Sequence, residues 1–286
     1  MNFLRNIENG TINIKKITIK EAFFIMLLIV LLELLGQIPI VIINILSKKY
    51  STALPYIDLV ADVIVKYFII TLFLILYSKI SYDMPRKQSL HKKKFIYVAI
   101  IIIGYRLAYN NSLFYLVDNV PMPNFITHAF EKLFISPIIM ILSSAVIAPI
   151  YEEVIFRGIL LKGMANKINS NLALIISALI FALLHMNIPQ GINAFLLGLI
   201  IGAIYLSSNS IYLCIFAHFI NNSVAIIISG ALQLLSGKYG KYGKYSMIIC
   251  SVEFLVGITI LIFAYRWYTR NKPGDTVGIY KEFVER

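Results

Sequence analysis

The stretch Ile150-Tyr-Glu-Glu-Val-Ile-Phe-Arg-Gly158 places three charged side chains inside an apolar segment that begins near Ser136. An ionisable side chain at bilayer depth is costly unless it is paired or faces a wet cavity, so such a cluster marks a candidate functional site. On a helix, Glu153 and Arg157 stand four residues apart on one face, which predicts an ion pair between them. Glu152 is rotated by about 100° from Glu153 and must find its partners on other helices.

The composition excludes a water-soluble globular protein. Of the 286 residues, 59% are hydrophobic and only 14% are charged, and the mean hydropathy of +0.81 is typical of a polytopic membrane protein. The net charge of +12 does not indicate nucleic-acid binding, because most Lys and Arg residues lie in short segments between apolar runs, where they set topology. Cys214 and Cys250 lie inside apolar runs, so no disulfide framework is expected.

Eight apolar runs are long enough, or nearly so, to cross a bilayer as helices at about 1.5 Å per residue. They cover residues 22–46, 58–78, 95–117, 136–161, 171–187, 190–207, 210–232 and 246–266. The sequence therefore predicts an all-α fold, a polytopic transmembrane helical bundle of about eight helices. A single membrane domain at residues 21–266 would lie between an N-terminal segment at 1–20 and a C-terminal tail at 267–286.

The distribution of basic residues predicts the orientation in the membrane. With the N-terminus inside, the cytoplasmic segments hold 17 Lys and Arg residues and the opposite segments hold six. The positive-inside bias therefore predicts that both termini are cytoplasmic, and the Ile-, Lys- and Asn-rich composition suggests a bacterial cell membrane. The threefold Gly-Lys-Tyr repeat between Gly237 and Tyr245 then falls in an outer loop, where we expect a flexible linker among lipid headgroups.

Two later runs carry polar side chains that lipid-facing helices avoid. They contain Phe181-Ala-Leu-Leu-His185 and His218-Phe-Ile-Asn-Asn222, and the first and last residues of the second stretch share a helix face. Counted from the turn at residues 166–171, Glu152 and His185 both lie about 21 Å up their helices. Counted from about Ser210, His218 lies about 12 Å and Asn222 about 18 Å up the later helix. Four polar side chains from three helices are therefore expected to meet at one depth.

Each of these polar residues alone is more typical of a hydrogen bond between membrane helices than of catalysis. Together, a carboxylate, two imidazoles and an amide at one depth favour hydrolytic chemistry. A carboxylate with a histidine can activate water as a general base. A histidine with an asparagine can donate hydrogen bonds to the oxyanion that forms at a peptide carbonyl.

The set Glu152-Glu153-x-x-x-Arg157, Phe181-x-x-x-His185 and His218-x-x-x-Asn222 resembles the three motifs of the CPBP intramembrane proteases. That family includes CAAX prenyl endopeptidases and bacterial Abi-type relatives linked to bacteriocin self-immunity and peptide-pheromone maturation. The resemblance covers about residues 136–225 and implies an intramembrane endopeptidase that cleaves a membrane-associated peptide or protein. It also implies that Glu152 and His185 activate water, that His218 and Asn222 form the oxyanion site, and that Glu153 and Arg157 give structural support.

Metal dependence is left open by the residues. The family is often labelled metalloprotease, and a divalent ion such as zinc could be held by Glu152, His185 and His218. The chain has no His-Glu-x-x-His motif and asparagine is a poor zinc ligand, so metal-free chemistry without a cofactor is favoured. Cys214 lies one turn before His218 on the same face, and we expect it to be a packing residue.

Two other functions stay open: a transporter or ion relay that uses the same Glu and His residues, and a non-catalytic immunity or regulatory binding protein. The absence of an inverted repeat in the sequence disfavours the transporter. Gly198 and Gly202 predict a close helix contact. The sequence assigns no role to four further charged residues within the predicted spans, Glu33, Lys66, Arg106 and Glu253. Arg106 could pair with a carboxylate or extend its guanidinium to the membrane surface.

Overall fold

The computed structural model describes residues 2–46, 54–81, 92–117, 120–134, 136–239 and 246–270, so most of the repeat loop and residues 271–286 of the tail lie outside the described part. In chain order the elements are α1 (Asn2–Glu8), β1 (Ile12–Ile14), α2 (Ile19–Leu46), α3 (Leu54–Tyr77), β2 (Ser78–Ile80), α4 (Lys92–Asn110), α5 (Leu113–Val117), α6 (Asn124–Phe134), α7 (Pro137–Met140), η1 (Ile141–Ile147), α8 (Ala148–Glu153), η2 (Val154–Leu161), α9 (Lys162–Ala165), α10 (Ser170–Leu183), α11 (Ile188–Ser208), α12 (Ile211–Tyr239) and α13 (Ser246–Arg270).

The expected polytopic helical membrane protein is confirmed, with fewer full-length spans than the eight runs suggest. Among the described residues, four helices are long and apolar enough to cross a membrane, at Ile19–Ile43, Pro55–Tyr77, Pro137–Ala165 and Ile188–Ser208. Three shorter apolar helices lie at Ser170–Leu183, Ile211–Ile227 and Cys250–Ala264. Large apolar side chains such as Leu34, Ile64 and Phe263 are more than 60% exposed, as expected for faces that contact lipid.

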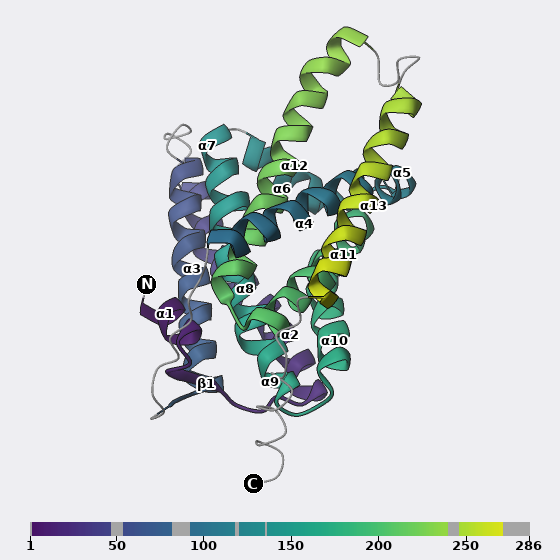
Figure 1. Ribbon diagram of the computed structural model, residues 1–286. Helices are drawn as coiled ribbons and strands as arrows, with labels where there is room; N and C mark the ends of the chain where they lie inside the picture. Colours follow the sequence, from purple (N-terminus) through teal and green to yellow (C-terminus); the bar gives the residue numbers. More distant parts are fainter. Residues whose placement is uncertain are drawn as a thin grey trace.

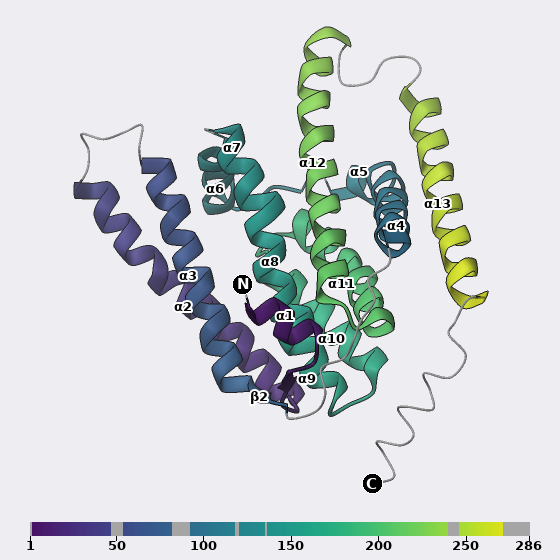
Figure 2. The ribbon, with the colours of Figure 1, turned by 60° about the vertical axis from the view of Figure 1, so that its left-hand side comes forward.

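The segment Pro137–Ala165 forms one continuous helix at the centre of the bundle, made of α7, η1, α8, η2 and α9. Figure 2 shows α8 between α3 on one side and α12 on the other. All eight residues of η2 and the preceding Glu153 are buried, so this part of the charged stretch is surrounded by protein rather than by lipid. The surrounding helices therefore have to supply the partners of its polar side chains.

This central helix contains two π-helical segments, η1 before the glutamates and η2 after them. In η1 the backbone N–H of Ala148 donates to Ser143 O, five residues back. Continuing this pattern, residue 149 would donate to Ser144 O, but Pro149 has no N–H. The Ser144 carbonyl is therefore left without a backbone donor and is available to a side chain from another helix. Such π-helical turns are frequent at functional sites.

The structure places His185 in a turn rather than inside the fifth predicted span. Helix α10 ends at Leu183 after 14 residues, about 21 Å of helix, which is too short to cross the roughly 30 Å hydrocarbon layer. The turn to α11 includes Met186 at a φ of +54°, an uncommon backbone conformation for a residue other than glycine. Irregular backbone at membrane depth is tolerated where protein buries it or where it lines a cavity, so this turn is a natural place for a functional histidine.

The N-terminal segment is folded against the ends of the helices. Strand β1 pairs antiparallel with β2, and Figure 1 shows β1 and α9 at the same end of the bundle. The backbone N–H of Ile17 donates to Gly163 O over 2.9 Å. Glu8 is 4% exposed and accepts hydrogen bonds from Ser210 Oγ (2.6 Å) and Ile211 N (2.8 Å). Its carboxylate thereby caps the first turn of α12.

Small residues set two close helix contacts. The predicted packing role of the glycines in α11 is confirmed, since a Cβ added at Gly198 would lie 3.0 Å from the Cβ of Ala178 on α10. Helices α4 and α13 approach even more closely, since a Cβ at Gly257 would lie 2.6 Å from the backbone N of Ala108. Backbones that approach this closely gain the van der Waals packing by which membrane helices associate.

Candidate active site

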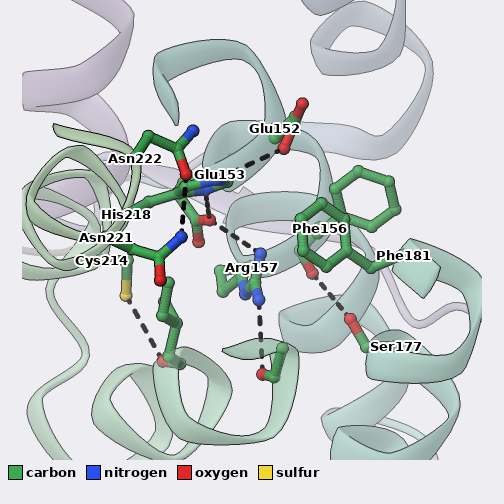
Figure 3. A network of polar contacts seen from close by, with 12 residues as sticks. Glu152, Glu153, Phe156, Arg157, Ser177, Phe181, Cys214, His218, Asn221 and Asn222 are labelled. Atoms are coloured by element: carbon green, nitrogen blue, oxygen red, sulfur yellow. Dashed lines mark hydrogen bonds and ion pairs between the residues drawn. The ribbon is translucent and has the colours of Figure 1, made fainter. Parts of the chain in front are cut away.

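Glu153 is the centre of a buried polar network (Figure 3). Its Oε1 accepts a hydrogen bond from Arg157 Nη1 at 2.8 Å and from His218 Nδ1 at 2.7 Å. Glu153 is 0% exposed and Arg157 is 1% exposed. The predicted ion pair is therefore confirmed, and the structure adds the imidazole from α12, which the spacing within one helix could not reveal.

The rest of the Arg157 guanidinium is held by two neighbouring helices. Nη2 donates to Gly198 O of α11 over 3.3 Å, and the guanidinium carbon lies 4.9 Å from the centroid of the Phe181 ring of α10. The hydroxyl of Ser177, one turn before Phe181, donates to Phe156 O over 3.1 Å. These contacts fix η2 against α10 and α11 and so set the position of both glutamates.

His218 stands between the two glutamates. Because a carboxylate accepts only, Nδ1–H donates to Glu153, and this leaves Nε2 directed at Glu152, with 3.7 Å between Nε2 and Oε2. The Glu152 side chain is 23% exposed, whereas that of Glu153 is 0% exposed. Glu152 is therefore the more accessible of the two carboxylates, and the bond to Glu153 fixes the orientation of the His218 ring.

His185 contacts the network through an aromatic ring. Its Nδ1 lies 2.9 Å from Phe181 O, which can only accept, so a neutral His185 carries its proton on Nδ1 and a free lone pair on Nε2. The Phe181 ring lies 5.0 Å from the His185 ring and 5.9 Å from the His218 ring, both edge to face. Within the described residues, no hydrogen bond or ion pair joins His185 to Glu152, so their cooperation stays a prediction.

Asn222 donates a hydrogen bond to the Ser144 carbonyl, which lacks a backbone donor because Pro149 has no N–H. Its Nδ2 donates to Ser144 O over 2.7 Å, and its Oδ1 accepts from Asn221 Nδ2 over 2.8 Å. Since an amide nitrogen carries two protons, one N–H of Asn222 remains for a ligand. The Asn222 amide could thus donate a hydrogen bond to an oxyanion, and its orientation is set by the contacts of both its nitrogen and its oxygen.

Sequence reasoning missed three features of this site: the Glu153–His218 bond, the Ser144 carbonyl and Asn221. Asn221 is 2% exposed and its Oδ1 has no hydrogen-bond partner among the described residues. An available signal was the doubled asparagine at 221–222, which parallels the doubled glutamate at 152–153. The Ser144 contact could have been anticipated only by combining Pro149 with a π-helical turn.

A second polar group lies beside Glu152, on the side of α2 and α3. Lys66 pairs with Asp62 on α3, and its ammonium lies 5.6 Å from the centroid of the Tyr151 ring. Glu33 of α2 is near enough to interact electrostatically with Lys66, Tyr151 and Glu152. The buried Tyr151 hydroxyl has no partner with hydrogen-bond geometry in the described part of the chain. Two of the residues without an assigned role are thus placed around the candidate base.

Metal binding at this site stays a prediction. Glu152 and His218 lie together, and Nδ1 of His185, the third expected ligand, contacts Phe181 O, which leaves Nε2 of this histidine free. The described residues contain no group of three or more His, Cys, Asp and Glu side chains arranged to hold a metal. Cys214 is fully buried, and its thiol donates to Ser210 O over 3.2 Å. A packing role for this cysteine agrees with that contact.

An apolar pocket lies between the helices that carry the site. Its volume is about 280 Å³, and its wall is made by η1, α8, α12 and the start of α4, at Phe95, Ala145, Val146, Ile150, Tyr212, Ile215, Phe216 and Phe219. Ala145 follows Ser144, and Phe219 follows His218. The pocket wall thus includes residues that are next in sequence to two residues of the polar network.

Comparison with known proteins agrees with the motifs. Residues 134–224 match the family of Rce1-like type II CAAX prenyl endopeptidases. A protein of Bacillus subtilis (strain 168) named "Putative membrane peptidase YdiL" is 32% identical over 89 residues, which cover 31% of this chain and 36% of that protein. The chain thus spans about a third of this curated relative's length. No solved structure matches the chain. The family resemblance drawn from the motifs is confirmed over this segment, which includes every candidate site residue.

Proposed function

We propose that the protein is an integral membrane endopeptidase, because residues 134–224 match the family of Rce1-like type II CAAX prenyl endopeptidases. It hydrolyses a peptide bond of a membrane-associated peptide or protein, in a bacterial cell membrane with both termini cytoplasmic. The observation that carries the proposal is that Glu153 binds both Arg157 and His218. It holds His218 so that the free Nε2 is directed at the accessible Glu152.

Glu152 is the general base. Its carboxylate takes a proton from a water molecule while the water oxygen attacks the carbonyl carbon of the scissile bond. The lone pair on Nε2 of His185 accepts the second proton of that water as a hydrogen bond and orients it. When the tetrahedral intermediate collapses, Glu152 returns its proton to the leaving amine as the C–N bond breaks, so the carboxylate is regenerated.

His218 and Asn222 stabilise the oxyanion. Because Nδ1–H is engaged by Glu153, His218 can donate from Nε2 only as an imidazolium. The second donor is the unused N–H of Asn222, whose amide is held by Ser144 O.

The test is cleavage by purified protein in liposomes. Glu152→Gln keeps the size of the side chain and removes the base, so cleavage should fall by about 10²–10⁴-fold with normal abundance and melting. His185→Ala should resemble it, and the double variant should lose little more. His218→Ala or Asn222→Ala should lower turnover by about 10²–10³-fold. Full cleavage by Glu152→Gln would end this mechanism.

Two further measurements complete the test. Comparison of membrane proteomes from cells with wild-type protein and with Glu152→Gln should reveal the substrate, because it accumulates uncut in the variant. A chelator added to the active preparation should leave turnover unchanged if the chemistry needs no metal. Inhibition by the chelator, reversed by added zinc, would assign the reaction to a metal ion.

A further inference from the structure

Asn221 on α12 is a buried amide that the proposed mechanism does not use. The residue is 2% exposed and lies three residues after His218, on the next turn of the same helix. Its Oδ1 has no hydrogen-bond partner in the described part of the chain. A buried acceptor without a donor lowers stability, and most buried polar atoms in proteins have partners, so this oxygen calls for a physical reason.

The orientation of Asn221 follows from the Ser144 carbonyl. A carbonyl oxygen only accepts, so Asn222 has to present its amide nitrogen to Ser144 O, at 2.7 Å. The oxygen of the same amide then faces Asn221 and also only accepts, so Asn221 presents its own Nδ2, at 2.8 Å (Figure 3). This order leaves Oδ1 of Asn221 outside the chain of hydrogen bonds. The unpartnered acceptor is therefore a consequence of holding Asn222 in one orientation.

A fixed orientation matters for an oxyanion donor. The last torsion of an asparagine side chain is broad and roughly two-fold, so an unrestrained amide exchanges its nitrogen and oxygen ends readily. In the opposite orientation, Asn222 would set its oxygen against Ser144 O and its nitrogen against Nδ2 of Asn221, and both hydrogen bonds would be lost. A donor lowers a barrier most when it is already aimed at the developing charge. Asn221 thus supplies the second of two contacts that hold the donor end of Asn222 in place.

We propose that Asn221 is a positioning residue for peptide-bond hydrolysis, because it holds the oxygen of the Asn222 amide so that the remaining N–H of Asn222 is directed at the oxyanion. The inference rests on the proposed endopeptidase function and adds to it a residue that acts through Asn222. The hydrogen bond from Asn221 also polarises the Asn222 amide and makes its N–H a stronger donor. Since Oδ1 of Asn221 is buried without a partner among the described residues, the arrangement lowers stability while it favours turnover.

The experiment measures Tm and the cleavage of an internally quenched peptide of eight apolar residues by purified Asn221→Leu. Leucine has the same branched arrangement of heavy atoms without the polar ones. We expect kcat to fall by about 3- to 10-fold, the effect of one neutral hydrogen bond. KM should stay within about twofold of the wild type, because the oxyanion forms only in the transition state. Tm should not fall, since the substitution removes a buried unpartnered oxygen. The matched control is Asn111→Leu, whose amide nitrogen donates to Leu107 O and Glu253 Oε2 where α4 meets α13, and it should keep the wild-type kcat.

Two further variants test whether Asn221 acts through Asn222. Asn221→Ala removes the same donor but leaves unfilled space, so its Tm should fall while its loss of kcat equals that of Asn221→Leu. In the Asn222→Ala background, Asn221→Leu should cause no further loss of kcat, because residues that act as one unit are not additive. Full kcat in Asn221→Leu would overturn the inference. So would losses of kcat that follow the losses of Tm, which indicate a merely structural role, or a further loss in the Asn222→Ala background.

A binding measurement separates this inference from the proposed function. It compares the peptide with an analogue that carries a phosphinate, a tetrahedral group with a negative oxygen, in place of the central peptide bond. In the Glu152→Gln background the phosphinate should raise Tm more than the peptide does, and adding Asn221→Leu should reduce only the effect of the phosphinate. If this dependence is found but the wild type cleaves neither the peptide nor any membrane protein in the proteome comparison, the endopeptidase proposal fails and the positioning of Asn222 stands. If the wild type cleaves the peptide but Asn221→Leu leaves the effect of the phosphinate unchanged, the positioning role is overturned and the endopeptidase stands.

Discussion

Arg157→Met should unfold the protein more easily, because it removes a cation while keeping a side chain of similar length. The substitution leaves Glu153 with one partner, His218, at a site where the carboxylate is 0% exposed. It also removes the hydrogen bond to Gly198 O and the contact over the Phe181 ring. The methionine still fills most of the space, so the loss of stability comes mainly from the removed charge.

The expected loss is about 3–5 kcal/mol, the cost of removing one member of a buried ion pair. Because a chain of this size shifts by roughly 2–4 °C per kcal/mol, Tm should fall by about 6–20 °C. A double-mutant cycle also needs Glu153→Gln, which leaves Arg157 as the unpaired charge and should lower the free energy of unfolding by a similar amount. The double variant carries no buried charge at the pair, so it should lose less than the sum of the two, by at least ~1 kcal/mol.

The assay is thermal unfolding of each purified variant in one detergent, followed by loss of monomer on size exclusion. Cleavage by the double variant separates stability from chemistry, since the Glu153→Gln substitution removes the carboxylate that stabilises a His218 imidazolium. Equal melting of Arg157→Met and the wild type would refute the structural role of the pair. Strict additivity in the double variant would show that the two charges do not interact.

Contacts elsewhere in the chain give three further predictions. Glu8→Ala removes the acceptor for Ser210 Oγ and Ile211 N and should destabilise the protein by about 1–3 kcal/mol, whereas exposed Arg5→Ala in the same helix should not change Tm. Gly257→Ala should cost about 1–3 kcal/mol by overpacking α4 against α13, measured by the same unfolding assay. In a Cys-free variant, a cysteine between residues 240 and 245 should react with an impermeant thiol reagent in intact cells and one at Lys92 should not; reversed labelling would contradict the topology.

Local spacing was sufficient to predict the Glu153–Arg157 pair, because residues four apart on a helix face each other whatever surrounds them. It also predicted the class of fold, since long apolar runs have few stable alternatives to membrane helices, and it predicted the close packing at Gly198 and Gly202. The motif set predicted the family resemblance over about residues 136–225, and residues 134–224 match that family. These conclusions depend on periodicity and composition, which belong to the sequence itself.

Contacts between distant segments required the tertiary structure. The short α10 and the left-handed Met186 place His185 in a turn, although its run is apolar enough to predict a longer helix. Which carboxylate His218 binds depends on the rotation of two helices that are 65 residues apart in the chain, and a rotation of about 100° separates the two glutamates. The hydrogen bond from Asn222 to the Ser144 carbonyl likewise arises only when helices pack, because its two partners lie 78 residues apart and meet across an interface.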